Sequence, residues 1–483
     1  VWINHAIYLD GDKWVGPILI PHSDNILNNS PAVAPAPEGG LLIAHSSDHR
    51  VDRMQTWRAN RLGPNAMALA LLNSGKDPFI NDIYVSRLAA TSNNAVDEAK
   101  LVVAKQQPNP NIKPLPKTIE ERKTLKRFGE FRSAINGREL EILKGEFHRH
   151  TELSGDGGND SSLEDMWRYA IDVAAMDWMG SGDHDNGGHR EYPWWITQKT
   201  TDAYHLPGVF ESMFTHERSV SYPEGHRNVV FDKRGIRTLP RLPRSSAEEF
   251  KPAPDTLMLY KYLKHFDGIC SSHTSATRMG TDWRNHDAEV EPIVEIYQGA
   301  RQNYERPGAP RAPSDKDALG GFFPKGFINH ALKKGYRLGF QSSSDHSSTH
   351  ISYCMVYAEG RSRTAILDAM KKRHTYAATD TILAEVRATA GGKDWMMGDE
   401  FATEETPSFK VKLIGTKPFA EIVIIKDDEV VHTAKSEGNE VAFEWSDPSP
   451  EAGKTSYYYV RGKQTDDELV WASPMWIKYA PKE

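Results

Sequence analysis

The chain has 483 residues, too many for one ordinary hydrophobic core, which indicates about two to four domains. Hydrophobic residues make up 39% of it and charged residues 26%, values typical of a soluble globular protein. The formal charge of -7, with scattered lysines and arginines, gives no basic footprint for nucleic acid, and no apolar run approaches the roughly 20 residues of a membrane helix.

The first part of the chain, residues 1–95, reads as short strands between turns. Examples are Ile18-Leu19-Ile20, Leu41 to Ala44 and Ile83-Tyr84-Val85. The pattern resembles the last blade of a β-propeller, and a small irregular β-subdomain is the alternative. The chain begins at Val1 without a methionine or a signal-peptide pattern, so we expect that a leader or a larger N-terminal part has been removed.

Residues 96–140 form a predicted linker followed by a charged helix. The proline-rich stretch from Gln106 to Pro116 favours an extended linker, and Glu120 to Phe131 is dense in charge and compatible with a helix. The two cysteines, Cys270 and Cys354, are too few for a disulfide framework, and buried thiols are the simpler interpretation.

The third segment, residues 141–382, alternates apolar strands with helical patterns and concentrates histidine. Thirteen of the 19 histidines lie between His148 and His350, which is too local for chance scatter and indicates a site. The last segment, residues 383–483, has short strands at regular spacing and predicts an all-β sandwich. It shows no catalytic constellation, so we expect it to serve packing or partner contact.

The stretch from Gly145 to Gly187 organises the third segment. In a strand, His148 and His150 point to the same face, so their imidazoles converge. A glycine-rich loop with Asp156 follows, and then a helix signature with Ser162 at its cap and an apolar stripe of Leu163, Met166, Ala170 and Val173. The second strand ends at Asp183-His184, which predicts ligand-type side chains at the carboxyl ends of both strands.

Three further clusters lie at strand-to-loop junctions. They are Glu217 with His226, His273 after an apolar strand, and Asp345-His346 after Gly339-Phe340. Imidazoles suit Zn, Fe and Mn, while carboxylates neutralise charge and bridge ions. Several ions held together lower the pKa of bound water and clamp the oxygens of a phosphoryl group, so the five clusters together predict a multinuclear metal site.

These motifs resemble the PHP (polymerase and histidinol phosphatase) superfamily of metal-dependent phosphoesterases, in particular a large, poorly characterised bacterial branch with a β-rich leader and a C-terminal β-sandwich. The resemblance rests on His148-Arg149-His150 with the Gly155-Asp156-Gly157 loop, and on the four clusters that follow. It implies an α/β fold, a distorted seven-stranded β/α barrel with two or three divalent ions (Zn, Mn or Fe) at the strands' carboxyl ends. It also implies a periplasmic or secreted location.

The expected metal ligands are His148, His150, Asp156, Asp183, His184, Glu217, His226, His273, Asp345 and His346. Asp156 could instead form only a turn, and Asp183 could orient His184 rather than ligate. The family spaces its last Asp and His by one residue, whereas here His346 is adjacent to Asp345, so either His346 ligates from a loop or His350 replaces it. Arg218 and His350 are the candidate catalytic residues, for phosphate contact and for protonation of the leaving group.

The resulting hypothesis is a metal-dependent hydrolase of a small-molecule phosphoester, in which a metal-bridged hydroxide attacks phosphorus in line. Hydrolysis of a C–O or C–N bond by the same scaffold is one alternative. A non-catalytic binding or assembly protein that keeps metal for stability is the other.

Overall fold

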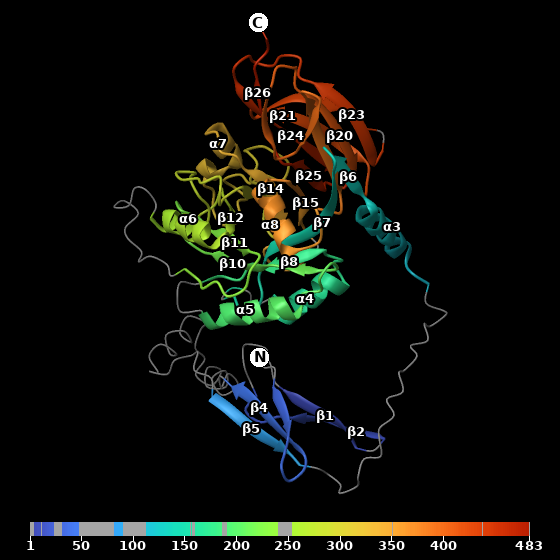
Figure 1. Ribbon diagram of the computed structural model, residues 1–483, viewed down its shortest axis with the longest axis vertical. Coiled ribbons are helices and arrows are strands. Elements are labelled where there is room, and N and C mark those ends of the chain that lie inside the picture. Colours follow the sequence, from blue (N-terminus) through green and yellow to red (C-terminus); the bar gives the residue numbers. More distant parts are fainter. Residues whose placement is uncertain are drawn as a thin grey trace. The chain divides into compact units, whose positions relative to one another are not determined.

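The structure of the chain is a computed structural model that describes residues 4–10, 12–23, 31–47, 82–89, 113–154, 156, 160–185, 191–239, 254–349, 351–436 and 438–482. The chain divides into two compact units, Val1–Lys113 and Pro114–Glu483, which Figure 1 draws.

The described residues of the first unit form two small antiparallel sheets. Strands β1 (His5–Asp10) and β2 (Lys13–Leu19) form a hairpin, and β3 (Ala32–Pro35), β4 (Leu41–Ser47) and β5 (Asp82–Leu88) form a three-stranded sheet. Buried residues alternate with less buried ones along β4, as in a sheet with one covered face. The likeness to a propeller blade stays a prediction, and most of the expected linker lies outside the described residues.

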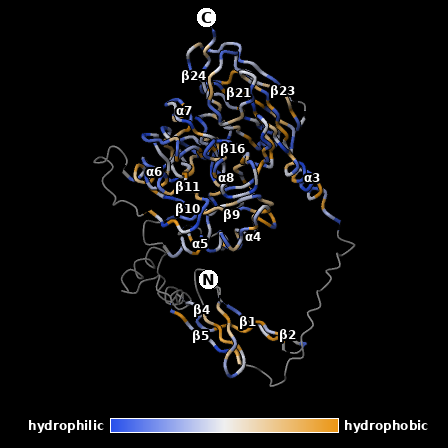
Figure 2. The backbone as a smooth tube through the Cα atoms, in the orientation of Figure 1, coloured by the Kyte–Doolittle hydropathy of each residue, from blue (hydrophilic) through white to orange (hydrophobic). Residues whose placement is uncertain are grey.

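The helices of the second unit follow their sequence signals. Helix α3 (Pro116–Glu130) starts at a proline and is largely blue in Figure 2, as its charge density predicts. In α4 (Leu163–Asp172) the hydroxyl of Ser162 accepts a hydrogen bond from the Asp165 amide, and Leu163, Met166 and Ala170 are buried. These features confirm the predicted cap and stripe, except that Val173 ends the helix and is exposed.

The remaining helical elements are α5 (Glu191–Ala203), α6 (Pro254–Phe266), the 3₁₀ turn η1 (Pro324–Gly326), α7 (Ile328–Lys333) and α8 (Arg363–Lys371). Helices α4 and α5 lie side by side next to β8 and β10 in Figure 1.

Eight strands carry or flank the predicted ligands. A five-stranded sheet contains β10 (Phe214–Arg218), β11 (Arg227–Phe231), β12 (Ile269–Ser272), β13 (Ile293–Gln298) and β14 (Gly339–Ser343). Strands β12, β13 and β14 run parallel, and β11 is antiparallel to both β10 and β12. In a second sheet β7 (Arg138–Arg149), β8 (Trp178–Ser181) and β9 (Glu211–Ser212) are parallel.

Two isolated bridges connect these sheets just beyond the strand ends. Arg149 pairs with Asp345, and His184 pairs with Glu217, both in parallel orientation. The sheets are otherwise separate, so the expected β/α barrel is not shown. What the described residues form is a mixed α/β fold, rich in strands and with few helices.

The sheet that contains β7 extends to the end of the chain and counts twelve strands in all. It adds β6 (Arg132–Ile135), β15 (Tyr353–Ala358), β16 (Thr375–Ala378), β19 (Glu400–Thr403), β21 (Phe419–Lys426), β22 (Glu429–Ala434), β24 (Thr455–Gln464), β25 (Leu469–Ala472) and β26 (Met475–Tyr479). A separate antiparallel sheet holds β17 (Leu383–Ala390), β18 (Lys393–Met396), β20 (Ser408–Ile414) and β23 (Glu440–Ser446). The short C-terminal strands are therefore present, and they continue the sheet of β7 through the pair β16–β25.

The hydrophobic core also joins the strands that carry the predicted ligands to the C-terminal strands. One cluster of buried residues combines Phe340 and Ile296 with Val423 and Trp471 from the C-terminal strands. Cys270 and Cys354 are buried free thiols in other clusters. None of the described helices has the length and hydropathy needed to cross a bilayer.

Candidate metal centre

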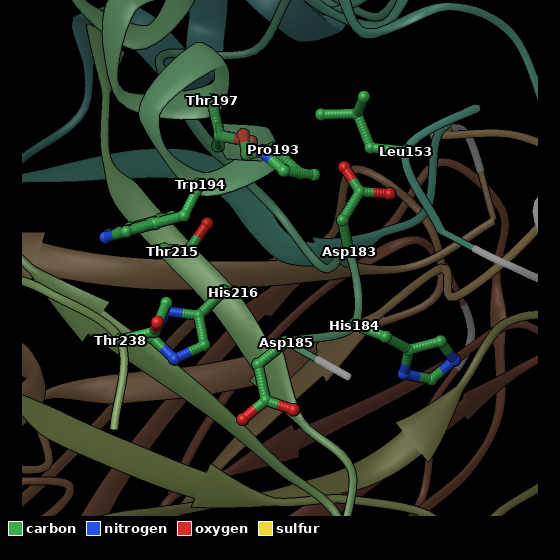
Figure 3. A pocket seen from close by; sticks show the side chains of 10 residues that line it. All are labelled: Leu153, Asp183, His184, Asp185, Pro193, Trp194, Thr197, Thr215, His216 and Thr238. Atoms are coloured by element: carbon green, nitrogen blue, oxygen red, sulfur yellow. The ribbon is translucent and has the colours of Figure 1, made fainter. Parts of the chain in front are cut away.

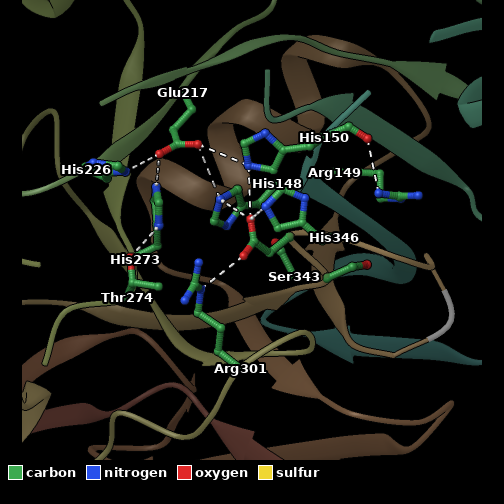
Figure 4. A network of polar contacts seen from close by, with 12 residues as sticks. His148, Arg149, His150, Glu217, His226, His273, Thr274, Arg301, Ser343 and His346 are labelled. Carbon is green, nitrogen blue, oxygen red and sulfur yellow. Dashed lines mark hydrogen bonds and ion pairs between the residues drawn. The ribbon is translucent and has the colours of Figure 1, made fainter. Parts of the chain in front are cut away.

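The predicted ligands other than Asp183 gather at one edge of the two sheets, and Figure 4 shows His148, His150, Glu217, His226, His273 and His346 among them. Strands β7, β8, β10, β12 and β14 present them at or just beyond their carboxyl ends. Strand β11 runs the other way, so it contributes His226 from just before its amino end. The edge that the sequence pattern indicated is therefore where the side chains meet.

The pair His148 and His150 enters the cluster as the strand period predicts. Their ring centroids are 5.4 Å apart, and both side chains are buried. Gly182 lets the end of β8 approach closely, because a Cβ atom there would lie 2.8 Å from the His148 backbone. A side chain at position 182 would push the two strand ends apart.

Glu217 is the centre of the cluster, with imidazole nitrogens facing both of its oxygens. Its Oε2 lies 3.2 Å from His150 Nε2 and 3.0 Å from His184 Nδ1. Its Oε1 lies 2.5 Å from His226 Nδ1 and 3.2 Å from His273 Nε2. If metal ions bind here, Glu217 would supply ligand oxygens on both of its sides.

Asp345 and His346 both reach the cluster although they are consecutive. Asp345 has a φ of 70° and Ser347 a φ of 74°, left-handed conformations that break the strand after β14. The turn places Asp345 Oδ1 3.0 Å from His150 Nε2 and 3.4 Å from His346 Nε2. The carbonyl of Asp345 accepts a hydrogen bond from the His150 amide, which stabilises the turn.

A more open set of donors lies beside these. His184 Nε2 is 2.8 Å from Asp156 Oδ2, and His346 Nε2 is 4.0 Å from the same oxygen. The Asp156 side chain is 52% exposed and that of His346 is 26% exposed. On the other side of the ring, His346 Nδ1 lies 2.7 Å from Asp160 Oδ2, a contact that orients the imidazole.

Other polar groups orient the imidazoles by contacting their second nitrogen. His148 Nδ1 is 2.9 Å from Glu295 Oε2, a fully buried carboxylate, and His150 Nδ1 is 2.7 Å from Ser154 Oγ. His273 Nδ1 is 3.0 Å from Thr274 Oγ1. Contacts of this kind select the tautomer that aims Nε2 at the cluster.

The concentrated charges shift the titration of the cluster. Burial alone would lower the pKa of His148, but the Glu295 and Asp345 carboxylates hold that pKa well above its usual value. His150, also buried, has its pKa raised to about 9 by Asp345 and Glu217. Burial would raise the pKa of Glu217, but the surrounding imidazoles hold it well below its usual value. Protons on His148 and His150 thus balance the carboxylates, whereas burial lowers the pKa of His273 to about 3 and keeps that imidazole neutral.

The donor set fits divalent metal ions. The Nε2 atoms of His148 and His273 are buried and have no hydrogen-bond partner, although both face carboxylates. The donor–donor distances around Glu217 and Asp345 mostly lie between 3.0 and 3.7 Å. Ligands bound at about 2.0–2.2 Å to one ion lie roughly 3–4 Å from each other, so these spacings suit shared ions.

Asp183 does not join the cluster. Its Oδ1 accepts from the Thr151 amide, and its Oδ2 accepts from the hydroxyls of Thr151 and Ser181. Both oxygens are thus engaged in fixing the chain just after His150. The geometry supports a positioning role for Asp183 and not the ligand role.

Arg218 is not placed to contact a substrate, which corrects the expectation for it. Its side chain is buried on the opposite face of β10 from Glu217, where it forms a paired hydrogen bond with Asp255 and a further one with Asp185. Two buried carboxylates hold the guanidinium in this arrangement. The other candidate catalytic residue, His350, lies outside the described residues.

Glu295 of β13 and Arg301 of the turn that follows it also belong to the site, and neither was predicted from the sequence. Glu295 supports His148, and Arg301 donates from Nε to Asp345 Oδ2 at 3.2 Å. Figure 4 shows the Arg301 guanidinium pointing toward the cluster. The carboxyl end of β13 carries no histidine, so no motif marks Glu295 and Arg301. The one signal in the sequence is their place on, or just after, a strand next to those that carry the ligands.

The cavity shown in Figure 3 lies between α5 and β10, behind His184. Its lining includes Trp194, Thr215 and His216, and its volume of about 20 Å³ suits roughly one water molecule. Burial lowers the pKa of His216 to about 4. This cavity is too small to take a substrate.

No family model matches the sequence. The chain is 25% identical over 370 residues to an uncharacterized protein of Chlamydia trachomatis, and 26% identical over 370 residues to one of Chlamydia muridarum. Each match covers 70% of this chain and 57% of the relative, so the chain spans little more than half the length of these curated relatives.

One solved structure with some similarity is a two-domain protein of Bacteroides vulgatus that contains a predicted PHP-like metal-dependent phosphoesterase. It shares 13% sequence identity at a TM-score of 0.35, and the match covers 71% of this chain and 97% of that one. A likeness this weak carries no argument about the fold or the activity of this chain.

Proposed function

We propose that the chain is a metal-dependent hydrolase that acts on phosphoesters. The observation that carries the proposal is Glu217, whose two oxygens each face imidazoles, beside the unpartnered buried Nε2 atoms of His148 and His273. Divalent ions bound there would supply Lewis-acid activation of the attacked group and of water. The proposed ligands are His148, His150, Asp156, His184, Glu217, His226, His273, Asp345 and His346.

Arg301 supports a phosphoester over other substrates. Its guanidinium is a permanent cation at the partly exposed rim of the cluster, where its Nε is bonded to Asp345. A planar cation beside ions suits the oxygens of a phosphoryl group, whose charge increases in the transition state. An ester or amide carbonyl would gain less from it.

The two bridges at the metal-binding edge also bear on the expected barrel. If the bridges Arg149–Asp345 and His184–Glu217 are counted as strand contacts, β7, β8 and β10–β14 follow one another around a ring of seven. We propose that this ring corresponds to the distorted barrel expected from the PHP resemblance. The periplasmic or secreted location also stays a prediction.

The test uses the full chain freed of metal and reloaded separately with Zn, Mn or Fe. Aryl phosphomonoesters and phosphodiesters are compared with aryl esters and anilides. We expect metal-dependent cleavage of a phosphoester, and an Arg301→Ala variant that raises KM about tenfold or more. Arg311→Ala is the matched control, because Arg311 lies farther along the same loop and pairs with Glu468. A chain that takes up no metal, or that cleaves only esters or anilides, contradicts the proposal.

A further inference from the structure

The turn that carries Arg301 is anchored at its first residues to the metal-binding edge. The amide of Gly299 donates to the Ser343 carbonyl at 2.8 Å, and the amide of Ala300 donates to the Ser344 carbonyl at 2.9 Å. These bonds tie the start of the turn to the segment that leads directly into Asp345.

The other end of the turn is anchored by the C-terminal strands. The buried carboxylate of Glu305 accepts two hydrogen bonds from Arg461 Nη1, at 2.9 and 3.1 Å. It also accepts 2.8 Å bonds from Tyr459 Oη and Trp471 Nε1. The three donors belong to β24 and β25, more than 150 residues farther along the chain.

This anchor restrains the end of the turn at Glu305. A carboxylate that is only 2% exposed is stable only while its hydrogen-bond donors stay in place. A shift of Glu305 would therefore leave two buried charges, its own and that of Arg461, without their partners. The next residue adds a second link, because Arg306 Nη1 donates to the Asp428 carbonyl at 2.6 Å in the turn between β21 and β22. The C-terminal sheet thus fixes two consecutive residues of the segment.

Arg301 lies between the two anchors. Its Nε reaches Asp345 Oδ2 at 3.2 Å, so a displacement of the turn moves the guanidinium relative to the cluster. We propose that the C-terminal β-sheet, acting through Glu305, positions Arg301 and thereby sets the affinity of the site for the phosphoryl group of the substrate. This inference rests on the proposed function and assigns the C-terminal strands a part in the site, beyond packing.

Two variants and one control test the anchor. Glu305→Gln removes the charge that pairs with Arg461, and Tyr459→Phe removes a single hydroxyl and serves if the first variant does not fold. Glu421→Gln is the matched control, because Glu421 contacts Arg461 Nη2 at 3.4 Å from a half-exposed position and does not touch the turn. Metal content is measured in each protein by elemental analysis and should equal that of the wild type.

Two readouts separate positioning from loss of fold. Amide hydrogen exchange over residues 299–305 should become faster in Glu305→Gln and Tyr459→Phe and stay unchanged in Glu421→Gln. The dissociation constant of the metal-loaded chain for inorganic phosphate should rise about tenfold in Glu305→Gln and about threefold in Tyr459→Phe. The phosphate contacts remain, but Arg301 is held less firmly in the binding orientation. The control should stay within about twofold.

Unchanged exchange over 299–305 in both variants overturns the inference. So does faster exchange with phosphate affinity equal to that of the wild type. If the wild-type chain loaded with metal binds no phosphate, the proposed function fails instead, and hydrogen exchange still decides whether the sheet fixes the turn.

Discussion

The donor cluster has a closed half and an open half that differ in how far water reaches them. In the closed half, formed by His148, Glu217 and His273, the side chains are 1–2% exposed. In the open half, formed by Asp156, His184 and His346, they are 14–52% exposed. Water competes weakly for an ion in the closed half and strongly in the open half. On the proposed function, the closed half would hold its metal ion tightly, and the open half would be where water and substrate reach the metal.

The largest effect is expected from breaking the closed half at its centre. Glu217→Gln removes the charge that faces imidazoles on both sides, so we expect the bound metal to fall by about two equivalents and kcat/KM to fall at least about 100-fold. Elemental analysis and steady-state kinetics measure these losses. Glu211→Gln, a buried glutamate of β9 that contacts His205, is the control and should keep its metal. Full metal content in Glu217→Gln would contradict the bridging role.

A smaller loss is expected when the closed half keeps its ligands but loses a support. Glu295→Gln weakens the contact that orients His148 through Nδ1, so metal affinity should drop about 10- to 100-fold without loss of stoichiometry at saturating metal. Competition with a chelator measures the affinity. Gln341→Leu is a useful comparison, because Gln341 contacts Glu295 only at 3.4 Å. Equal losses in the two variants would mean that packing, and not orientation of His148, matters.

The open half should tolerate substitution better. Asp156→Asn removes a carboxylate that faces His184, and we expect the loss of at most about one equivalent of metal and about a tenfold fall in kcat/KM. Asp172→Asn, at an exposed aspartate that ends α4, should behave as the wild type. A loss in Asp156→Asn as large as that in Glu217→Gln would remove the distinction between the halves.

The smallest effect is expected on the stability of the fold, from Lys144, a buried charge outside the donor cluster. Lys144 also lies on β7, and burial lowers its pKa from 10.5 to about 8, while its Nζ donates to the Ala174 carbonyl. The folded state therefore binds fewer protons than the unfolded state between pH 8 and 10.5, so this residue destabilises most below pH 8 and the cost fades as the pH rises. Lys144→Met should gain about 1 kcal/mol at pH 7, after the loss of the carbonyl contact.

Denaturant unfolding at pH 7 and pH 9.5 measures this gain, which should shrink at the higher pH. Lys372→Met, at an exposed lysine, should change stability little at either pH. A stability gain that grows with pH would show that the pKa of Lys144 is not lowered in the folded state.

Local patterns predicted much of this edge of the molecule. The two-residue period brought His148 and His150 together, and the cap at Ser162 and the apolar stripe located α4. These features depend on neighbours in sequence, which is why a single chain reveals them. The sequence predicts a phosphate contact for Arg218, whereas Asp185 and Asp255, which no local pattern links to it, hold its guanidinium.

The rest depends on contacts between distant segments or on an unusual backbone. The spacing of Asp345 and His346 appeared unsuitable for two ligands, because consecutive side chains diverge in a strand, and only the left-handed φ at Asp345 resolves this. Glu305 and Arg461 are 156 residues apart and carry no motif. The closed barrel expected from the resemblance is not shown by the pairing of the described strands.

The pairing of β16 with β25 has a consequence for the history of such chains. A gene that ended before β25 would leave β16 as a bare strand edge, open to pairing with other molecules. A recombination event that exchanged the last hundred codons would have to supply a strand in matching register and a donor for Glu305 at once. The two regions should therefore be inherited together, and their substitutions should be correlated.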